Sequence, residues 1–122
     1  MPDVLNPEAE QFFLARSTHD EVGTAFMESL KALGEYEIRG ELRSYKSPYA
    51  VTANIVFGGA AGMTHVFFRL SSSDREIALK TGAEQGDIGP EWVQIELYRP
   101  NWPKPDLNHW ARRAYVFARE GR

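Results

Sequence analysis

The chain of 122 residues contains no cysteine, and this absence excludes several classes of protein at once. Without thiols there is no disulfide framework, no cysteine-bound zinc or iron–sulfur cluster and no cysteine nucleophile. The sequence also lacks the run of about 18–20 apolar residues that a membrane-spanning helix needs, since its longest apolar stretch, residues 50–57, is interrupted by Thr52 and Asn54. The first residues carry neither the basic segment nor the apolar core of a secretory signal. We therefore expect a cytoplasmic protein with no membrane partner.

Histidine is scarce, and the usual motifs of catalysis are missing. His19, His65 and His109 lie far apart and form no spacing typical of metal ligands. The serines of residues 71–73 lack the G-x-S-x-G context of a nucleophilic serine. The glycine-rich residues 58–62 join two expected strands, whereas a phosphate loop leads into a helix. The sequence thus predicts no metal, no other cofactor and no catalytic residue, and it favours a protein that is not an enzyme.

What is present suits one globular domain. Hydrophobic residues make up 43% of the chain and charged residues 25%, which are ordinary values for a folded protein. The seven Phe, five Tyr and three Trp can fill a core of this size. We predict a single domain over residues 1–122, in which residues 1–6 are a mobile lead-in.

The charge is unevenly spread along the chain. The net charge of −3 argues against a protein that binds nucleic acid over its whole surface. Residues 1–37 hold eight acids and two bases, residues 38–98 seven acids and six bases, and residues 99–122 two acids and six bases. The last segment therefore carries +4 and the first −6. Either the basic end marks a binding face, or the acidic and basic helices simply neighbour each other and neutralise.

Two helices are expected near the N-terminus. Asn6 followed by proline predicts the start of a short helix over about residues 7–16. Thr18 and Glu21 have the spacing of a capping box at the start of a second helix. Its apolar residues recur at helical spacing until Gly34, which we expect to end it.

After Gly34 the apolar period changes from 3.6 to 2, which predicts strands. We expect five of them, near residues 36–43, 51–57, 63–70, 76–81 and 92–98. Residues 58–62 and 71–74 are expected to be turns, and residues 82–90 a loop. Phe67 and Phe68 point to opposite faces of their strand, so both faces are expected to be partly covered there. Such short connections favour an antiparallel meander.

The chain is expected to close with a helix. Residues 100–105 contain three prolines and cannot be helical, and Asp106 follows them as an N-cap. The apolar residues after it share one helical face: Leu107, Trp110, Ala114, Phe117 and Ala118. The fold class is therefore α+β, a five-stranded antiparallel meander sheet with N-terminal helices and one C-terminal helix, all packed on one face.

The leading candidate surface is the junction between the last strand and the closing helix, where bases and an aromatic residue mix. Its residues are Arg99, Trp102, Lys104, Arg112 and Arg113. Basic and aromatic side chains interleave in this way on surfaces that bind single-stranded nucleic acid, and also where a helix packs across a sheet edge. Trp102, which lies between prolines, is alternatively a plug over the core. The first hypothesis is a non-catalytic module that binds a protein or nucleic-acid partner through this junction.

Two other hypotheses remain open. One is a small-molecule-binding protein or enzyme with a pocket formed by His65, Arg69, Lys80, Glu84 and Trp92. In this pocket the acids of the 84–92 loop, among them Asp87 and Glu91, could serve as a general acid and base. The other is a homodimer formed through an apolar second face of the sheet, at Val56, Val66 and Phe68.

Four short motifs between residues 57 and 114 carry a resemblance that covers about residues 20–120. They are Phe57-Gly58-Gly59 at a strand end, the aromatic pair Phe67-Phe68, the expected strand Ile77-Ala78-Leu79-Lys80-Thr81, and Trp110-Ala111-Arg112-Arg113-Ala114 in the closing helix. Together they resemble the TfoX N-terminal and YjbR-like group of small α+β domains. Residues 82–90 and 100–105 have no counterpart in that group. Its members are linked to competence regulation, so the resemblance implies a regulatory or binding role and carries over no catalytic residue.

Overall fold

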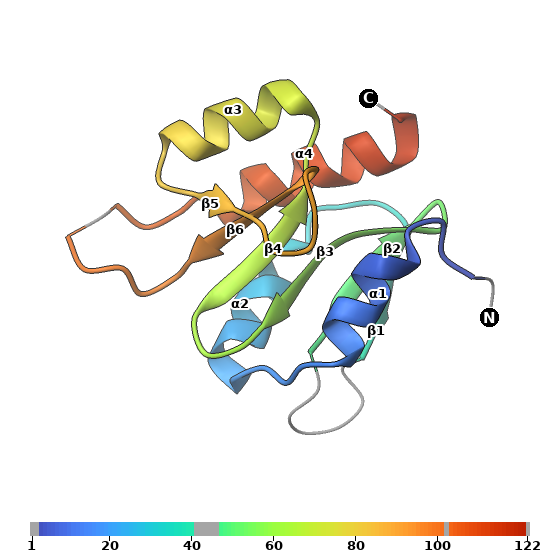
Figure 1. Cartoon of the computed structure of the whole chain (residues 1–122), viewed down its shortest axis with the longest axis horizontal. Helices are drawn as coiled ribbons and strands as arrows, with labels where there is room; N and C mark the ends of the chain where they lie inside the picture. The colour runs from blue at the N-terminus through green and yellow to red at the C-terminus, as the bar shows by residue number, and fades with distance from the viewer. Residues whose placement is uncertain (1–2, 41–46, 102, 122) are drawn as a thin grey trace.

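The computed structural model describes residues 3–40, 47–101 and 103–121, and within them it shows an α+β fold (Figure 1). The described residues form four helices and one antiparallel sheet of six strands, so the expected class is confirmed with one strand more than expected. In chain order the elements are α1 (Pro7–Leu14), α2 (Asp20–Ser29), β1 (Glu37–Arg39), β2 (Tyr49–Thr52), β3 (Ile55–Ala61), β4 (His65–Arg69), α3 (Ser72–Lys80), β5 (Glu84–Gln85), β6 (Trp92–Glu96) and α4 (Leu107–Glu120).

The sheet is a meander over its first four strands only. Its strand order is β1-β2-β3-β4-β6-β5, and each pair of neighbours is antiparallel. After β4 the chain passes through α3 to the edge strand β5, and β6 then inserts between β5 and β4. The end of β6 and the start of α4 therefore lie beside the segment that follows α3 (Figure 1).

Residues 76–81, expected to be a strand, belong instead to α3 apart from Thr81. Ser71 caps this helix, because its hydroxyl accepts a hydrogen bond from the Asp74 amide at 3.3 Å. The alternation of Ile77 and Leu79 suggested a strand, yet both side chains are exposed and only Ala78 is buried. The prediction failed because alternation of apolar residues does not reveal which of them the fold covers.

The second expected strand, near residues 51–57, is really the hairpin β2–β3. Its two-residue turn is Ala53-Asn54, and both residues adopt positive φ values of 51° and 63°, as a primed hairpin turn requires. Gly58 and Gly59, expected in the following turn, lie inside β3 and are buried, whereas Gly62 follows β3 and is exposed with φ 80°. Gly59 is needed in β3, since a Cβ at that position would come within 2.5 Å of the Phe13 ring.

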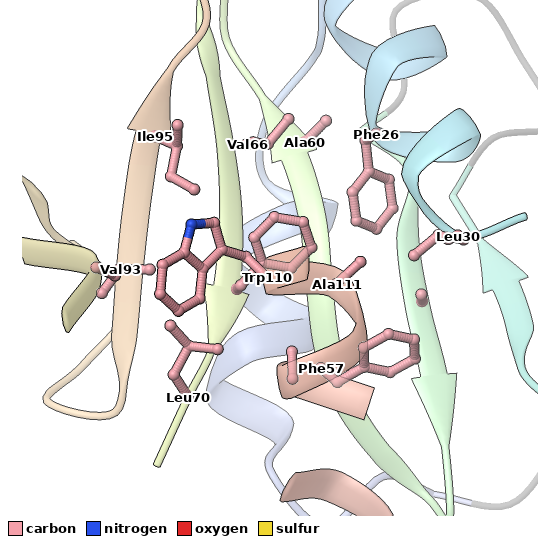
Figure 2. Close-up of a cluster of buried hydrophobic side chains, with 14 of the residues drawn as sticks. Phe26, Leu30, Phe57, Ala60, Val66, Leu70, Val93, Ile95, Trp110 and Ala111 are labelled. Carbon is pink, nitrogen blue, oxygen red and sulfur yellow. The ribbon is translucent and has the colours of Figure 1, made fainter. Parts of the chain in front are cut away.

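A first cluster of buried side chains lies between the sheet and helices α2 and α4. Its large members include Phe26, Phe57 and Trp110, which Figure 2 labels, and also Phe68. The β2–β3 register shifts between Ala50 and Val51, which places both Phe57 and Gly58 toward this face.

A second cluster lies on the opposite face of the sheet, beneath α1. It contains Phe13, Tyr49, Val56, Phe67 and Trp92 among others. The expected arrangement with every helix on one face is therefore wrong, whereas the opposite orientations of Phe67 and Phe68 are confirmed. Val56, Val66 and Phe68, expected to share a free dimer face, are fully buried and divided between the two clusters, so they form no exposed surface.

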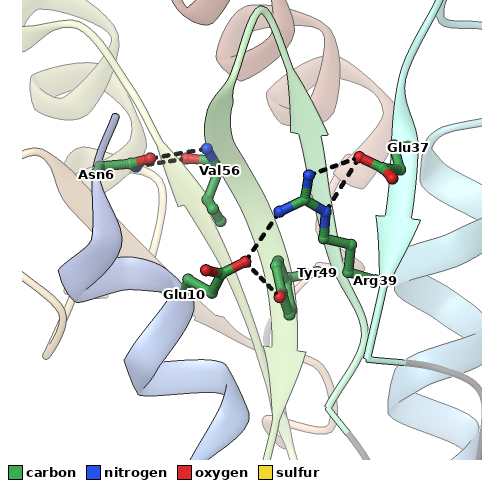
Figure 3. Close-up of polar contacts among 6 residues, drawn as sticks. All are labelled: Asn6, Glu10, Glu37, Arg39, Tyr49 and Val56. Carbon is green, nitrogen blue, oxygen red and sulfur yellow. Dashed lines mark hydrogen bonds and ion pairs between the residues drawn. The ribbon is translucent and has the colours of Figure 1, made fainter. Parts of the chain in front are cut away.

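Residues 3–6, part of the expected mobile lead-in, contact the sheet. Val4 is buried in the second cluster. The Asn6 side-chain amide donates to the Val56 carbonyl and accepts from the Val56 amide, each at 2.9 Å (Figure 3). Asn6 precedes α1 without capping it through its side chain, and it joins the start of α1 to β3.

The helix caps were predicted with mixed success. His19, and not Thr18, caps α2, because its Nδ1 accepts from the Glu21 amide. Thr18 is buried and its hydroxyl lies 2.8 Å from the Ala60 carbonyl oxygen. Helix α2 ends at Ser29, before the expected stop at Gly34. For α4 the prediction is confirmed, since the Asp106 carboxylate accepts from the His109 amide at 3.1 Å.

The expected apolar face of α4 is also present. Trp110, Ala114 and Ala118 are buried, while Leu107 and Phe117 are partly buried. Among the described residues, no helix is long and apolar enough to cross a membrane.

Candidate ligand-binding site

A pocket of about 820 Å³ lies where the end of β6 meets the start of α4. Three stretches of chain line it: residues 81–83 after α3, residues 95–99 at and beyond the end of β6, and residues 103–110 around the start of α4. The insertion of β6 beside β5 brings these stretches together. We call this site the β6–α4 pocket.

The walls of the β6–α4 pocket are mostly apolar. Ala83, Ile95 and Leu97 form one side, and Trp110 of α4 forms another. Most of them belong to the first buried cluster or pack against it, so the core holds these walls in place. Pro103 and Pro105 also line the pocket, and their fixed φ angles stiffen the segment that leads into α4.

Cationic groups stand at the same pocket. Arg99 and Lys104 both line it and both are exposed to solvent. The Arg99 guanidinium donates to the Gly82 carbonyl at 3.1 Å, which orients the side chain. His109 lies beside Trp110, with ring centroids 4.6 Å apart in an edge-on arrangement. An anionic group would find favourable partners here.

Two of the four described residues of the expected basic junction line the β6–α4 pocket. Arg99 and Lys104 line the β6–α4 pocket, and Arg112 is exposed on α4. Arg113 is engaged elsewhere, because its Nε donates to the Asp74 carboxylate of α3 at 2.9 Å. Trp102 lies outside the described residues.

The acidic and basic ends of the chain are neighbours in space. Helix α2, which carries Asp20, Glu21 and Glu28, contacts the basic helix α4 on the same face of the sheet. The Arg119 guanidinium donates to the Thr52 hydroxyl of β2 at 2.8 Å and so is used within the fold. The two helices are thus neighbours, as one interpretation of the charge distribution expected, and Arg99 and Lys104 are bases that line the pocket.

The residues of the expected alternative pocket are only partly brought together. His65 Nε2 and Glu84 Oε1 lie 3.0 Å apart, so these two residues do meet. Arg69 instead binds the Glu91 carboxylate at 3.2 Å and lies over an aromatic ring of α4. Lys80 is exposed at the end of α3, where the sequence placed it on a strand. Trp92 is buried in the second cluster, so it does not line an open site with them.

Glu96 joins His65 and Glu84 on the same face of the sheet, and the sequence analysis did not predict this. One ligand atom from each of the three residues lies within 4.8 Å of the other two. Burial alone would raise the pKa of the Glu84 carboxyl, but hydrogen bonds from His65 and Gln94 outweigh it and lower that pKa. The sequence pattern places Gln94 and Glu96 on one face of a strand. Only the pairing of that strand with β4 brings Glu96 beside His65, and local sequence does not show this pairing.

The fold and the pocket together define an α+β domain with helices on both faces of an antiparallel sheet and a ligand-sized site at one end. In comparisons with known proteins, no family model, no curated protein and no solved structure matches the chain. The function is therefore argued from the site itself.

Proposed function

We propose that the protein is a non-catalytic binding module that holds a small, mostly apolar molecule with an anionic group in the β6–α4 pocket. The observation that carries this proposal is the pocket itself, with apolar walls and two exposed bases. Its volume of about 820 Å³ falls in the range of roughly 300–1,000 Å³ that is usual for small-molecule sites.

The charges at the pocket favour an anion over a neutral ligand. Arg99 and Lys104 are both basic, and the N-terminus of the 14-residue helix α4 adds its positive dipole end. Glu96 and Asp106 also line the pocket, but Asp106 already accepts the His109 amide as a helix cap. A carboxylate or sulfonate on an aromatic or aliphatic body would match both the walls and the bases.

A second candidate function is binding of a protein or nucleic-acid partner through the bases of this region. Lys104, in the segment before α4, and Arg112, on the surface of α4, are both exposed, which favours this candidate. The regulatory role implied by the resemblance to TfoX-like domains fits either candidate, with a small ligand or a macromolecule as the partner.

A matched pair of fluorescent probes tests the first proposal. 1-Anilinonaphthalene-8-sulfonate combines an apolar body with an anionic group, and N-phenyl-1-naphthylamine is the same body without the sulfonate. We expect the sulfonate probe to bind the wild-type protein. In an Arg99→Gln, Lys104→Gln double variant its affinity should fall about tenfold, the loss of roughly one charged hydrogen bond, while the neutral probe should bind as before.

Arg112→Gln is the matched control, because Arg112 is an exposed base of α4 that does not line the pocket. It should bind both probes like the wild type. Near-ultraviolet circular dichroism must show that each variant is folded, since these probes also bind loosely packed chains. Failure of both probes to bind, or equal sulfonate affinity in the wild type and the double variant, would contradict the proposal.

A further inference from the structure

Three potential metal ligands meet on one face of the sheet, the face that also carries Phe67 and Trp92. His65 of β4 is the direct cross-strand partner of Glu96 of β6. Glu84 of β5 is the partner of Gln94, two residues before Glu96 on the same face of β6. Directly opposed residues have Cβ atoms about 4.5–5.5 Å apart. The three side chains therefore converge because of strand register and not because of sequence spacing.

We infer that His65, Glu84 and Glu96 form a binding site for a divalent transition metal ion such as Zn²⁺. Their ligand atoms lie within 4.8 Å of one another, and His65 Nε2 is 3.0 Å from Glu84 Oε1. Ligand atoms around a tetrahedral zinc ion lie about 3.4 Å apart. To close the site, ligand atoms would have to move closer together by up to about 1.4 Å. This inference does not rest on the proposed function.

Two further side chains are placed to support the ligands. The Thr64 hydroxyl lies 2.8 Å from His65 Nδ1, and a hydroxyl can either donate to that nitrogen or accept from it. It can therefore hold the tautomer in which Nε2 is free to bind a metal. Gln94 Nε2 donates to Glu84 Oε1 at 3.3 Å and orients that carboxylate. Such outer partners are a regular feature of metal sites.

The chemistry of the ligands favours a particular class of ion. One imidazole nitrogen and two carboxylates suit Zn²⁺ or a similar transition metal, and the two negative charges balance the ion. Mg²⁺ and Ca²⁺ prefer six or more oxygen ligands, and we expect them to bind much more weakly. The Glu84 side chain is about half exposed, so water can supply a remaining ligand. Among the described residues, no side chain donates a hydrogen bond to the Glu96 carboxylate, which leaves it available.

The test uses Zn²⁺ alone as the probe. Isothermal titration calorimetry of the chelator-treated protein should show one Zn²⁺ per chain, and Co²⁺ should give the strong visible absorption of a four-coordinate ion. His65→Gln and Glu96→Gln should each weaken Zn²⁺ binding by at least tenfold. Thr64→Val should weaken it about tenfold by removing the outer partner of His65.

Two matched controls carry the same changes outside the cluster. His109→Gln and Glu76→Gln alter an exposed histidine and an exposed glutamate, and both should keep wild-type Zn²⁺ affinity. His65 does not line the β6–α4 pocket, so His65→Gln should lose Zn²⁺ but still bind the sulfonate probe. Absence of Zn²⁺ binding by the wild type up to about 0.1 mM, or unchanged affinity in either ligand variant when folded, would overturn the inference. Equal loss in His109→Gln would do the same.

Discussion

At the scale of single residues, a short chain of charged and phenolic groups ties α1 to the sheet. Glu10 of α1 accepts a hydrogen bond from the Tyr49 hydroxyl at 2.7 Å and pairs with Arg39 at 3.0 Å (Figure 3). Arg39 also pairs with Glu37 at 2.9 Å. Burial raises the pKa of the Tyr49 phenol well above its usual range, and the neighbouring Glu10 carboxylate raises it further.

This shift predicts how the stability depends on alkaline pH. The unfolded tyrosine ionises near pH 10, whereas Tyr49 in the folded protein stays protonated. The protonated Tyr49 phenol therefore makes its full contribution to the free energy of unfolding below about pH 10. That contribution is lost as the pH rises further, by at most about 1.4 kcal/mol per pH unit. Urea unfolding between about pH 8 and 11 should show this decline, and Tyr49→Phe should make it shallower. An identical slope in the two proteins would contradict the prediction.

At the scale of secondary-structure elements, predictions succeeded where the signal was local. Helix α4 carries its own start at Asp106 and its own apolar face, so the sequence was enough. Helix α3 was mistaken for a strand because it has no apolar face at helical spacing. Only its Ala78 is buried, and this burial depends on packing against strands that come later in the chain. The β2–β3 turn was overlooked because Ala53-Asn54 contains no glycine, although both residues adopt the left-handed conformation.

The unusual turn predicts a stabilising substitution. Ala53 is exposed and adopts φ 51°, a conformation that glycine accepts without the cost a Cβ brings. Ala53→Gly should therefore raise the free energy of unfolding by about 0.5–1 kcal/mol, measured as a higher midpoint of urea unfolding. Ala32→Gly is the control, since Ala32 is exposed but its φ is not positive, and it should give no gain. A lower midpoint for Ala53→Gly would refute the argument.

At the scale of the whole molecule, the uneven charge of the sequence has a structural explanation. The acidic helix α2 and the basic helix α4 share one face of the sheet and contact each other. Arg113 and Arg119 are held by partners within the fold. Arg99 and Lys104 line the pocket, where Arg99 also donates to the Gly82 carbonyl, and Arg112 is exposed on α4. The net charge of the last segment therefore overstates the charge available to a partner.

This distinction separates the two arginines that are adjacent in α4. Arg112→Glu should leave thermal unfolding nearly unchanged, because Arg112 is exposed. Arg113→Glu should lower the free energy of unfolding by about 1 kcal/mol. The substitution removes the Arg113–Asp74 ion pair, which is only partly shielded from water, and places a second carboxylate next to Asp74.

If a nucleic-acid partner uses this region, Arg112→Glu should also abolish binding of a labelled single-stranded oligonucleotide, followed by fluorescence anisotropy. Binding that persists in Arg112→Glu would exclude this residue from the interface.

The sequence by itself determined the α+β class, the opposite faces of Phe67 and Phe68, and the start and buried face of α4. These features depend on residues within a turn or two of each other, and their patterns are visible without a fold. The tertiary structure alone decided that helices cover both faces of the sheet and that β6 inserts beside β5. It alone paired His65 with Glu96 and formed the β6–α4 pocket. The reason is that register and layer order arise from contacts between distant segments, which local periodicity does not record.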